Sequence, residues 1–182
     1  MKVLAFAASN SLQSINKKLV TYASSLINDA DIDILDINDY EMPLYSIDRE
    51  ENEGIPDLAH QFYAKIGNAD ALLISYAEHN GSYTAAYKNL YDWTSRIDMK
   101  VFQNKPTLLL ATSPGPGGAR NVLSTAVNSA PHFGAELVAD LSVASFYDNF
   151  DVESATVSDP TIATQLNNAI SKLTQAMANK NS

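Results

Sequence analysis

Residues 5–19 read AFAASNSLQSINKKL, and the change of character within this stretch decides the fold. An apolar run ends at Ala8, small polar residues follow, and a helical pattern begins at Asn16. Continuous apolar runs are typical of strands that are covered on both faces of a parallel sheet. The stretch therefore predicts a buried strand, a polar loop and a helix in succession.

The rest of the chain repeats this order of strand and helix. Strands are expected at residues 3–8, 31–37, 71–76, 107–112 and 136–144. Segments of helical period are expected at residues 16–27, 56–66, 83–97 and 119–133, and from Asp159 onward. Such alternation predicts an α/β fold, with a parallel sheet covered by helices on both faces. We interpret the acidic run at residues 48–53 as part of a solvated loop.

The composition limits the classes of function. A length of 182 residues suits a single domain, which we expect to span residues 1–182. The absence of cysteine and the wide separation of the three histidines lead us to expect no metal site. A formal charge of −9 argues against binding to nucleic acid or to anionic membranes. We find no signal-like N-terminus and no apolar segment of membrane-spanning length, so we expect a soluble cytoplasmic protein.

The loop after the first strand is rich in hydroxyls and amides. Ligands of a parallel sheet bind beyond the carboxyl ends of its strands, which is where this loop lies. Its polar residues surround the N-terminus of the first helix, at Ser9, Asn10, Ser11, Ser14 and Asn16. A helix N-terminus favours an anion, so the cluster predicts a phosphate cradle, although a single cap would explain one such residue. Because neither GxxxxGK[ST] nor GxGxxG is present, we expect a mononucleotide.

The loops after the third and fourth strands hold glycine and proline at the same rim. They read AEHNGS at residues 77–82 and SPGPGGA at residues 113–119. Turns alone account for such residues, but glycine also lets bare backbone approach a flat ligand. The meeting of three unusual loops at one edge favours a ligand site there.

These stretches together resemble the NADPH-dependent FMN reductase family of flavodoxin-like proteins, over nearly the whole chain. The family's first loop resembles GSxRxxSxN, which this chain matches at Ser9, Ser14 and Asn16. Its second motif resembles PEYNGS followed by LKNxxDWxSR, and the matching positions are Glu78, Asn80, Gly81, Ser82, Lys88, Asn89, Asp92, Trp93, Ser95 and Arg96. Its third, SPGxxGG, is met by Ser113, Pro114, Gly115 and Gly118. The chain departs from the family at Ser11, Ala77 and His79, which replace arginine, proline and tyrosine.

The resemblance implies a flavodoxin-like three-layer α/β/α sandwich whose five-stranded parallel sheet has the order 2-1-3-4-5. It implies bound FMN, NADPH or NADH as electron donor, and a quinone, flavin, azo compound or similar small molecule as acceptor. It also implies a homodimer or homotetramer. The implied cofactor-binding residues are Ser9, Ser11, Ser14, Ile15, Asn16, Ala77, Glu78, His79, Asn80, Gly81, Ser113, Pro114, Gly115 and Gly118.

Flavin itself carries such chemistry, so we assign no catalytic side chain. We expect Glu78 to fix its loop through hydrogen bonds. We also expect that replacing Ser14 and Asn16 together by Ala weakens FMN binding and leaves the fold intact. With Ser11 in place of arginine, the candidates for contact with the 2′-phosphate of NADPH are Lys17, Lys18 and Arg120.

Two other functions stay open at this point. A flavodoxin-like electron carrier would suit the acidic charge, and a non-catalytic FMN-binding sensor would need only the loops. The reductase differs from both because it oxidises NAD(P)H directly. A hydrolase of the α/β type is not supported, since GxSxG is absent.

Overall fold

The computed structural model describes residues 1–180 and contains the predicted parallel sheet. The strand order is β2-β1-β3-β6-β7, which confirms the predicted flavodoxin-like order 2-1-3-4-5. All four neighbouring pairs run parallel. The strands are β1 (Lys2–Ala8), β2 (Asp31–Leu35), β3 (Ala71–Tyr76), β6 (Lys105–Thr112) and β7 (Ala135–Val143).

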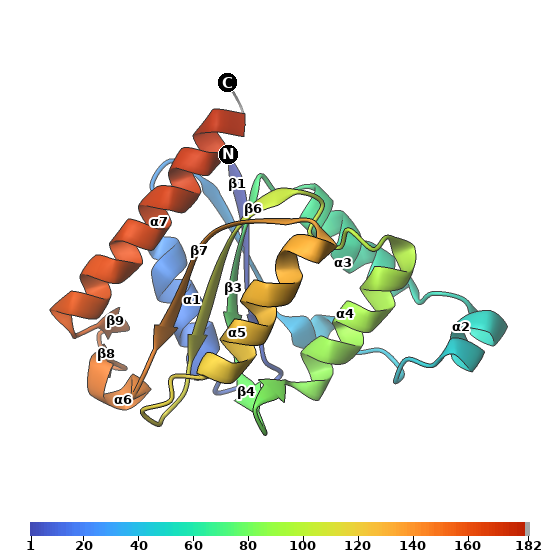
Figure 1. Cartoon of the computed structure of the whole chain (residues 1–182), viewed down its shortest axis with the longest axis horizontal. Helices are drawn as coiled ribbons and strands as arrows, with labels where there is room; N and C mark the ends of the chain where they lie inside the picture. Colours follow the sequence, from blue (N-terminus) through green and yellow to red (C-terminus); the bar gives the residue numbers. More distant parts are fainter. Residues whose placement is uncertain (181–182) are drawn as a thin grey trace.

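Helices cover both faces of this sheet (Figure 1). One face carries α1 (Ile15–Ser25) and α7 (Pro160–Lys180), and the other carries α3 (Asp57–Gly67), α4 (Ala85–Ile97) and α5 (Arg120–Ser129). The strand arrowheads point to the lower edge in Figure 1, so the loops predicted to form the site share that edge.

Successive side chains of each strand enter two different cores, because side chains alternate across a sheet. The core under α1 and α7, which we call the aliphatic layer, includes Leu19, Leu73 and Leu173. The core under α3, α4 and α5, which we call the aromatic layer, includes Phe6, Phe62, Tyr76, Tyr87 and Trp93. The continuous apolar runs of β1, β3 and β6 are thus explained by burial on both faces.

Several predicted boundaries are wrong for local reasons. The second strand ends at Leu35, and η1 (Ile37–Tyr40) follows it. The helix expected over residues 119–133 breaks into α5 and η2 (Ala130–Phe133), because Pro131 lacks the N–H that an α-helix needs. The helix expected from residue 83 begins at Ala85, since residues 78–83 form a small hairpin of β4 (Glu78–His79) and β5 (Ser82–Tyr83).

The acidic run is not a loop, which corrects our interpretation of residues 48–53. It lies within α2 (Ile47–Glu53), which Ser46 caps by accepting a hydrogen bond from the N–H of Arg49. The helix has no buried residue and projects from the body of the protein (Figure 1). Glu50 ties it back to α4 through an ion pair with Arg96 at 2.9 Å.

After β7 the chain adds a short excursion before α7. It consists of α6 (Phe146–Asn149), β8 (Phe150–Asp151) and β9 (Thr156–Val157), and the two strands form a hairpin beside α1. Within residues 1–180, no helix is long and apolar enough to cross a membrane. The same residues include no cluster of three or more metal-ligating side chains.

Candidate functional site

A cavity of about 260 Å³ lies where the three predicted loops meet. It is lined by ten of the residues predicted for the site: Ser9, Ser11, Ser14, Ile15, Asn16, Ala77, Glu78, His79, Ser113 and Pro114. The fold thus brings together side chains that are about one hundred residues apart in the sequence.

The first loop presents hydroxyls at the start of α1. Ser9 and Ser14 are each only 7% exposed, and the Ser9 hydroxyl accepts a hydrogen bond from the N–H of Ser11 at 3.3 Å. Ser14 caps α1 by accepting from the N–H of Lys17 at 3.2 Å. The cap leaves the N–H groups of Ile15 and Asn16 without intrahelical partners, so the cavity is lined by the positive end of a helix.

Asn16 has a structural role that the sequence did not reveal. Its amide donates to the carbonyl of Thr112 at 3.1 Å, and its oxygen accepts from the N–H of Thr112 and the hydroxyl of Ser75. The side chain is 2% exposed, so it links α1 to β3 and β6 from within the core. We therefore expect Ala at Asn16 to lower the stability of the fold as well as to affect FMN binding, because the replacement leaves buried polar groups unpaired.

Glu78 fixes its loop, as expected. Its carboxylate accepts hydrogen bonds from the N–H of Val122 at 3.0 Å and from the side chain of Asn121 at 3.2 Å. Both residues lie in the first turn of α5, which has no side-chain cap of its own. Glu78 therefore caps α5 from a neighbouring loop and joins the second loop to the helix that follows the third.

Asn80 and Gly81 form the tip of the β4–β5 hairpin and do not line the cavity. Both have left-handed backbone, with φ of 52° and 77°. Two left-handed central residues are what a type I′ hairpin turn requires, and Asn-Gly is the pair that best supplies them. The turn accounts for these two residues, and their contact with a flavin stays a prediction.

The third loop is held rigidly against the end of β7. The N–H of Ser145 donates to the carbonyl of Gly115 at 2.9 Å, and the N–H of Phe146 donates to that of Ser113 at 3.0 Å. Gly118 has φ of 59°, and a Cβ there would lie 2.4 Å from the hydroxyl oxygen of Ser142. Gly115 and Gly118 do not line the cavity, so the structure explains Gly118 by packing.

The cavity also contains residues that the sequence reasoning missed, namely Gln13, Thr112 and Tyr147. Tyr147 follows the fifth strand of the sheet, whose carboxyl end reaches the same rim as the others. Its side chain is 63% exposed, and its ring meets that of Phe146 edge to face at 5.4 Å. Its place directly after the predicted fifth strand is the signal in the sequence that points to this residue.

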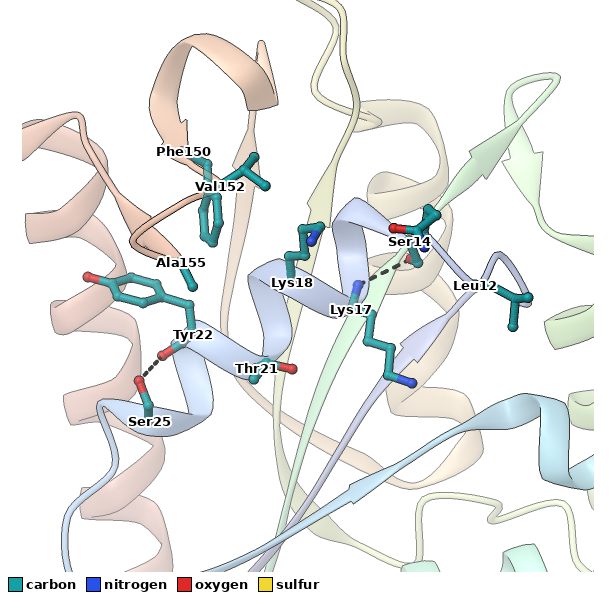
Figure 2. Close-up of a pocket in the computed structure, with 11 residues that line it drawn as sticks. Leu12, Ser14, Lys17, Lys18, Thr21, Tyr22, Ser25, Phe150, Val152 and Ala155 are labelled. Carbon is teal, nitrogen blue, oxygen red and sulfur yellow. Dashed lines mark hydrogen bonds between the residues drawn. The ribbon is translucent and has the colours of Figure 1, made fainter.

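A second hollow of about 420 Å³ adjoins the first loop, between α1 and the β8–β9 hairpin (Figure 2). We call it the α1 groove. It shares Gln13 and Ser14 with the cavity. Its other lining residues are Leu12, Lys17, Lys18, Thr21, Tyr22, Ser25, Phe150, Val152 and Ala155.

The three cations proposed for a 2′-phosphate lie in different settings. Lys17 forms an ion pair with Asp36 at 2.6 Å, while Lys18 makes no ion pair within residues 1–180 and leaves α1 on the side opposite to Lys17 in Figure 2. Arg120 lines a separate hollow between α5 and β7. Of the three, Lys18 is the one that lines the α1 groove and has no ion-pair partner among residues 1–180.

The DWTSR stretch of α4 serves packing. Trp93 is fully buried, donates from Nε1 to the carbonyl of Pro43 at 2.7 Å, and meets the ring of Tyr45 edge to face at 5.0 Å. Arg96 binds Glu50 of α2. These contacts hold residues 41–54, which we call the α2 arm, against α4.

A group of tyrosines lies directly beneath the second loop. Tyr76 and Tyr87 are buried with their hydroxyls 3.3 Å apart, and Tyr83 packs against both rings. Burial raises the pKa of all three phenols above the ordinary value of 10.0. The phenols are therefore neutral at physiological pH and act as packing groups and hydrogen-bond partners.

Comparison with known proteins adds independent findings. The model of a family described as NADPH-dependent FMN reductase matches residues 1–148. A 2-hydroxy-1,4-benzoquinone reductase of a Burkholderia species is 35% identical over 120 residues, which are 65% of this chain and 63% of that protein. An NAD(P)H-dependent FMN reductase of Pseudomonas aeruginosa is 34% identical over 119 residues, with the same two shares. The alignments thus span less than two thirds of these curated relatives.

Solved structures share the fold. FerB from Paracoccus denitrificans, a flavoenzyme NAD(P)H:(acceptor) oxidoreductase, superposes with a TM-score of 0.78 at 23% identity, over 98% of this chain and 97% of that chain. At this level of identity the similarity establishes the arrangement of strands and helices alone.

Proposed function

Because the chain belongs to the NADPH-dependent FMN reductase family, we propose that it is an FMN-dependent NAD(P)H oxidoreductase that reduces quinones, flavins, azo compounds or similar small molecules. The observation that carries this proposal is the cavity at the carboxyl edge of the sheet, which joins the hydroxyls of the first loop to the backbone of the other two.

The residues of the cavity fit FMN. Ser9, Ser11 and Ser14 supply hydroxyls around the free N–H groups of α1, and such a set binds a phosphate without an adjacent cation. Next to the cavity residue Pro114, a Cβ added to Gly115 would meet nothing within 4 Å, so the backbone there leaves room for a flat ring. We propose the fourteen residues predicted from the sequence as the binding set, with Asn16 acting through its backbone.

Bound FMN would supply the redox chemistry, which consists of accepting a hydride from NAD(P)H and passing electrons to the acceptor in a ping-pong sequence. The protein places the reactants and needs no acid or base of its own. The third loop forms a fixed wall, Glu78 locks the second loop to α5, and the exposed ring of Tyr147 lines the cavity.

We propose that residues 1–182 form one FMN-binding domain that assembles as a homodimer or homotetramer. The α2 arm supports this assembly, because it projects from the body and carries Leu44 at 75% and Ile47 at 60% exposure. Light scattering on the protein as it elutes from a size-exclusion column measures the mass of the assembly. A monomer that does not change with concentration would remove the proposal of assembly.

The first experiment is the visible spectrum of the purified protein after FMN is added and unbound flavin is removed. Retained flavin that bleaches without oxygen on addition of NADH or NADPH supports the reductase, and the two rates rank the donors. Retained flavin that does not bleach favours the carrier or sensor. Loss of all flavin on desalting contradicts a tightly held cofactor.

Ser14→Ala tests the phosphate position. We expect FMN binding to weaken by about 10- to 100-fold, because one hydrogen bond to a charged group is lost. Ser46→Ala is the matched control, since it removes the same kind of helix cap from α2, far from the cavity. Equal FMN affinity in both variants would remove the assignment of the first loop.

A further inference from the structure

We propose that the α1 groove binds the adenosine monophosphate half of a flavin dinucleotide, so that the protein holds FAD as well as FMN. The inference rests on the proposed function, because it places the remaining half of FAD in the cavity proposed for FMN. It goes further by giving a ligand to a hollow that the FMN site does not use.

The groove is continuous with the phosphate end of the cavity. Gln13 and Ser14 line both hollows, and the hydroxyl of Ser14 lies at the N-terminus of α1, where the FMN phosphate is proposed to bind. A second phosphate bonded to the first would leave the cavity at this point and enter the groove directly.

The charge of the groove suits a phosphate. Its lining includes Lys17 and Lys18 and no carboxylate, although the chain carries a formal charge of −9. Lys17 is neutralised by Asp36, whereas Lys18 leaves α1 on the opposite side and lines the groove (Figure 2). Lys18 is thus the residue we assign to the second phosphate.

The far part of the groove suits a flat aromatic base. Tyr22 and Phe150 meet edge to face at 6.0 Å, and Val152 and Ala155 stand on the hairpin side of the hollow in Figure 2. Val152 is 43% exposed, an apolar surface that a bound ring would cover. The hollow of about 420 Å³ lies within the size range of small-molecule sites.

Calorimetric titration of the flavin-free protein with FMN and with FAD tests the proposal. We expect the Kd for FAD to lie within about tenfold of that for FMN. Lys18→Glu should raise the Kd for FAD about tenfold or more and that for FMN less than about threefold, because the charge reversal faces the second phosphate. Val152→Glu should likewise raise the Kd for FAD more than the Kd for FMN.

Lys172→Glu is the matched control, since it makes the same change of net charge at an exposed position of α7 that lines neither hollow. It should leave both Kd values unchanged, and circular dichroism checks that each variant is folded. The proposal would be overturned if FAD binds more than about 100-fold more weakly than FMN. It would also be overturned if Lys18→Glu and Val152→Glu weaken the binding of both flavins equally.

Two further outcomes separate this proposal from the proposed function. If Lys18→Glu raises the KM for NADPH and leaves the Kd for FAD unchanged, the groove serves the electron donor and the FAD assignment is wrong. If FMN binds and FAD does not, the FMN site stands and only the groove assignment fails. If neither flavin binds the folded protein, both are overturned.

Discussion

The aliphatic and aromatic layers pack against opposite faces of the same strands, yet they stabilise the protein by different means. In the aliphatic layer, side chains such as Leu19, Leu173 and Ile170 have no polar group, so they hold α1 and α7 in place through burial of apolar surface. In the aromatic layer, buried rings carry polar tips that hydrogen-bond outward, as Trp93 does with Pro43. The aromatic layer therefore also fixes segments that lie outside the core.

This difference matters because each layer supports a different part of the site. The aliphatic layer positions α1, whose N-terminus and outer surface form the proposed phosphate end and the groove. The aromatic layer positions the second loop and the α2 arm through Tyr76, Tyr83 and Trp93. A change in one layer should therefore disturb one end of the site and spare the other.

Trp93→Ala gives the largest expected effect and tests this separation. We expect a loss of about 4 kcal/mol in the free energy of unfolding, because a fully buried ring and its hydrogen bond to Pro43 are removed. Leu173→Ala in the aliphatic layer should cost about 3 kcal/mol. Hydrogen exchange should quicken in the α2 arm only for the Trp93 variant. Equal exchange in the two variants would show that the layers are not independent.

Asn16→Ala comes next, and it tests the polar link between α1 and the sheet. The replacement leaves the N–H and carbonyl of Thr112 and the hydroxyl of Ser75 unpaired, so we expect a loss of about 2–4 kcal/mol. Ser75→Ala, which removes one of these bonds, should cost about 1 kcal/mol. Chemical unfolding at neutral pH measures both. A loss below that of Ser75→Ala would contradict the bridging role of Asn16.

Alkaline pH should destabilise the aromatic layer selectively. Burial raises the folded-state pKa of Tyr76 and Tyr87 above the ordinary value of 10.0, so their neutral forms stabilise the fold fully below pH 10. This contribution is lost as the pH rises above 10 toward the folded-state pKa. The double variant Tyr76→Phe with Tyr87→Phe should cost about 1 kcal/mol at pH 7 and reduce the alkaline loss. Tyr147→Phe, at an exposed position, serves as the control and should not reduce it.

Asp36→Asn has the smallest expected effect and probes the charge next to the aliphatic layer. The hydrogen bond from Lys17 lowers the pKa of Asp36 below the ordinary value of 3.8. The ion pair therefore adds stability above pH 3.8, and this stability is lost as the pH falls through the lowered pKa. Because both side chains are partly exposed, the loss at pH 7 should be about 0.5 kcal/mol or less. Unfolding curves of the variant and of the unchanged protein are compared at pH 7 and at pH 3. The same displacement between the two proteins at both pH values would contradict this ion pair.

Most of the fold was predictable because it depends on patterns that span whole elements. The buried runs of β1, β3 and β6 and the apolar period of α7 identify themselves in the sequence. The α2 arm could not be predicted in the same way. Its helix buries no residue and is held by Trp93 and Arg96, about fifty residues further along the chain.

The candidate site likewise has one part that the sequence predicts and another that it does not. The hydroxyls of the first loop were recognisable because they cluster in sequence beside a helix N-terminus. The buried role of Asn16 depends on Ser75 and Thr112, which only the folded sheet brings near. The α1 groove depends on the β8–β9 hairpin, whose short strands have no periodic pattern to reveal them.

The third loop has a further consequence for how molecules enter and leave. Its carbonyls at Ser113 and Gly115 are bonded to the turn after β7, and Gly118 has no room to shift toward Ser142. Such a wall cannot swing open as a lid. In the proposed enzyme, substrate entry and product release would therefore not be limited by the opening of this loop. The fixed shape of the cavity would decide which flat molecules can bind.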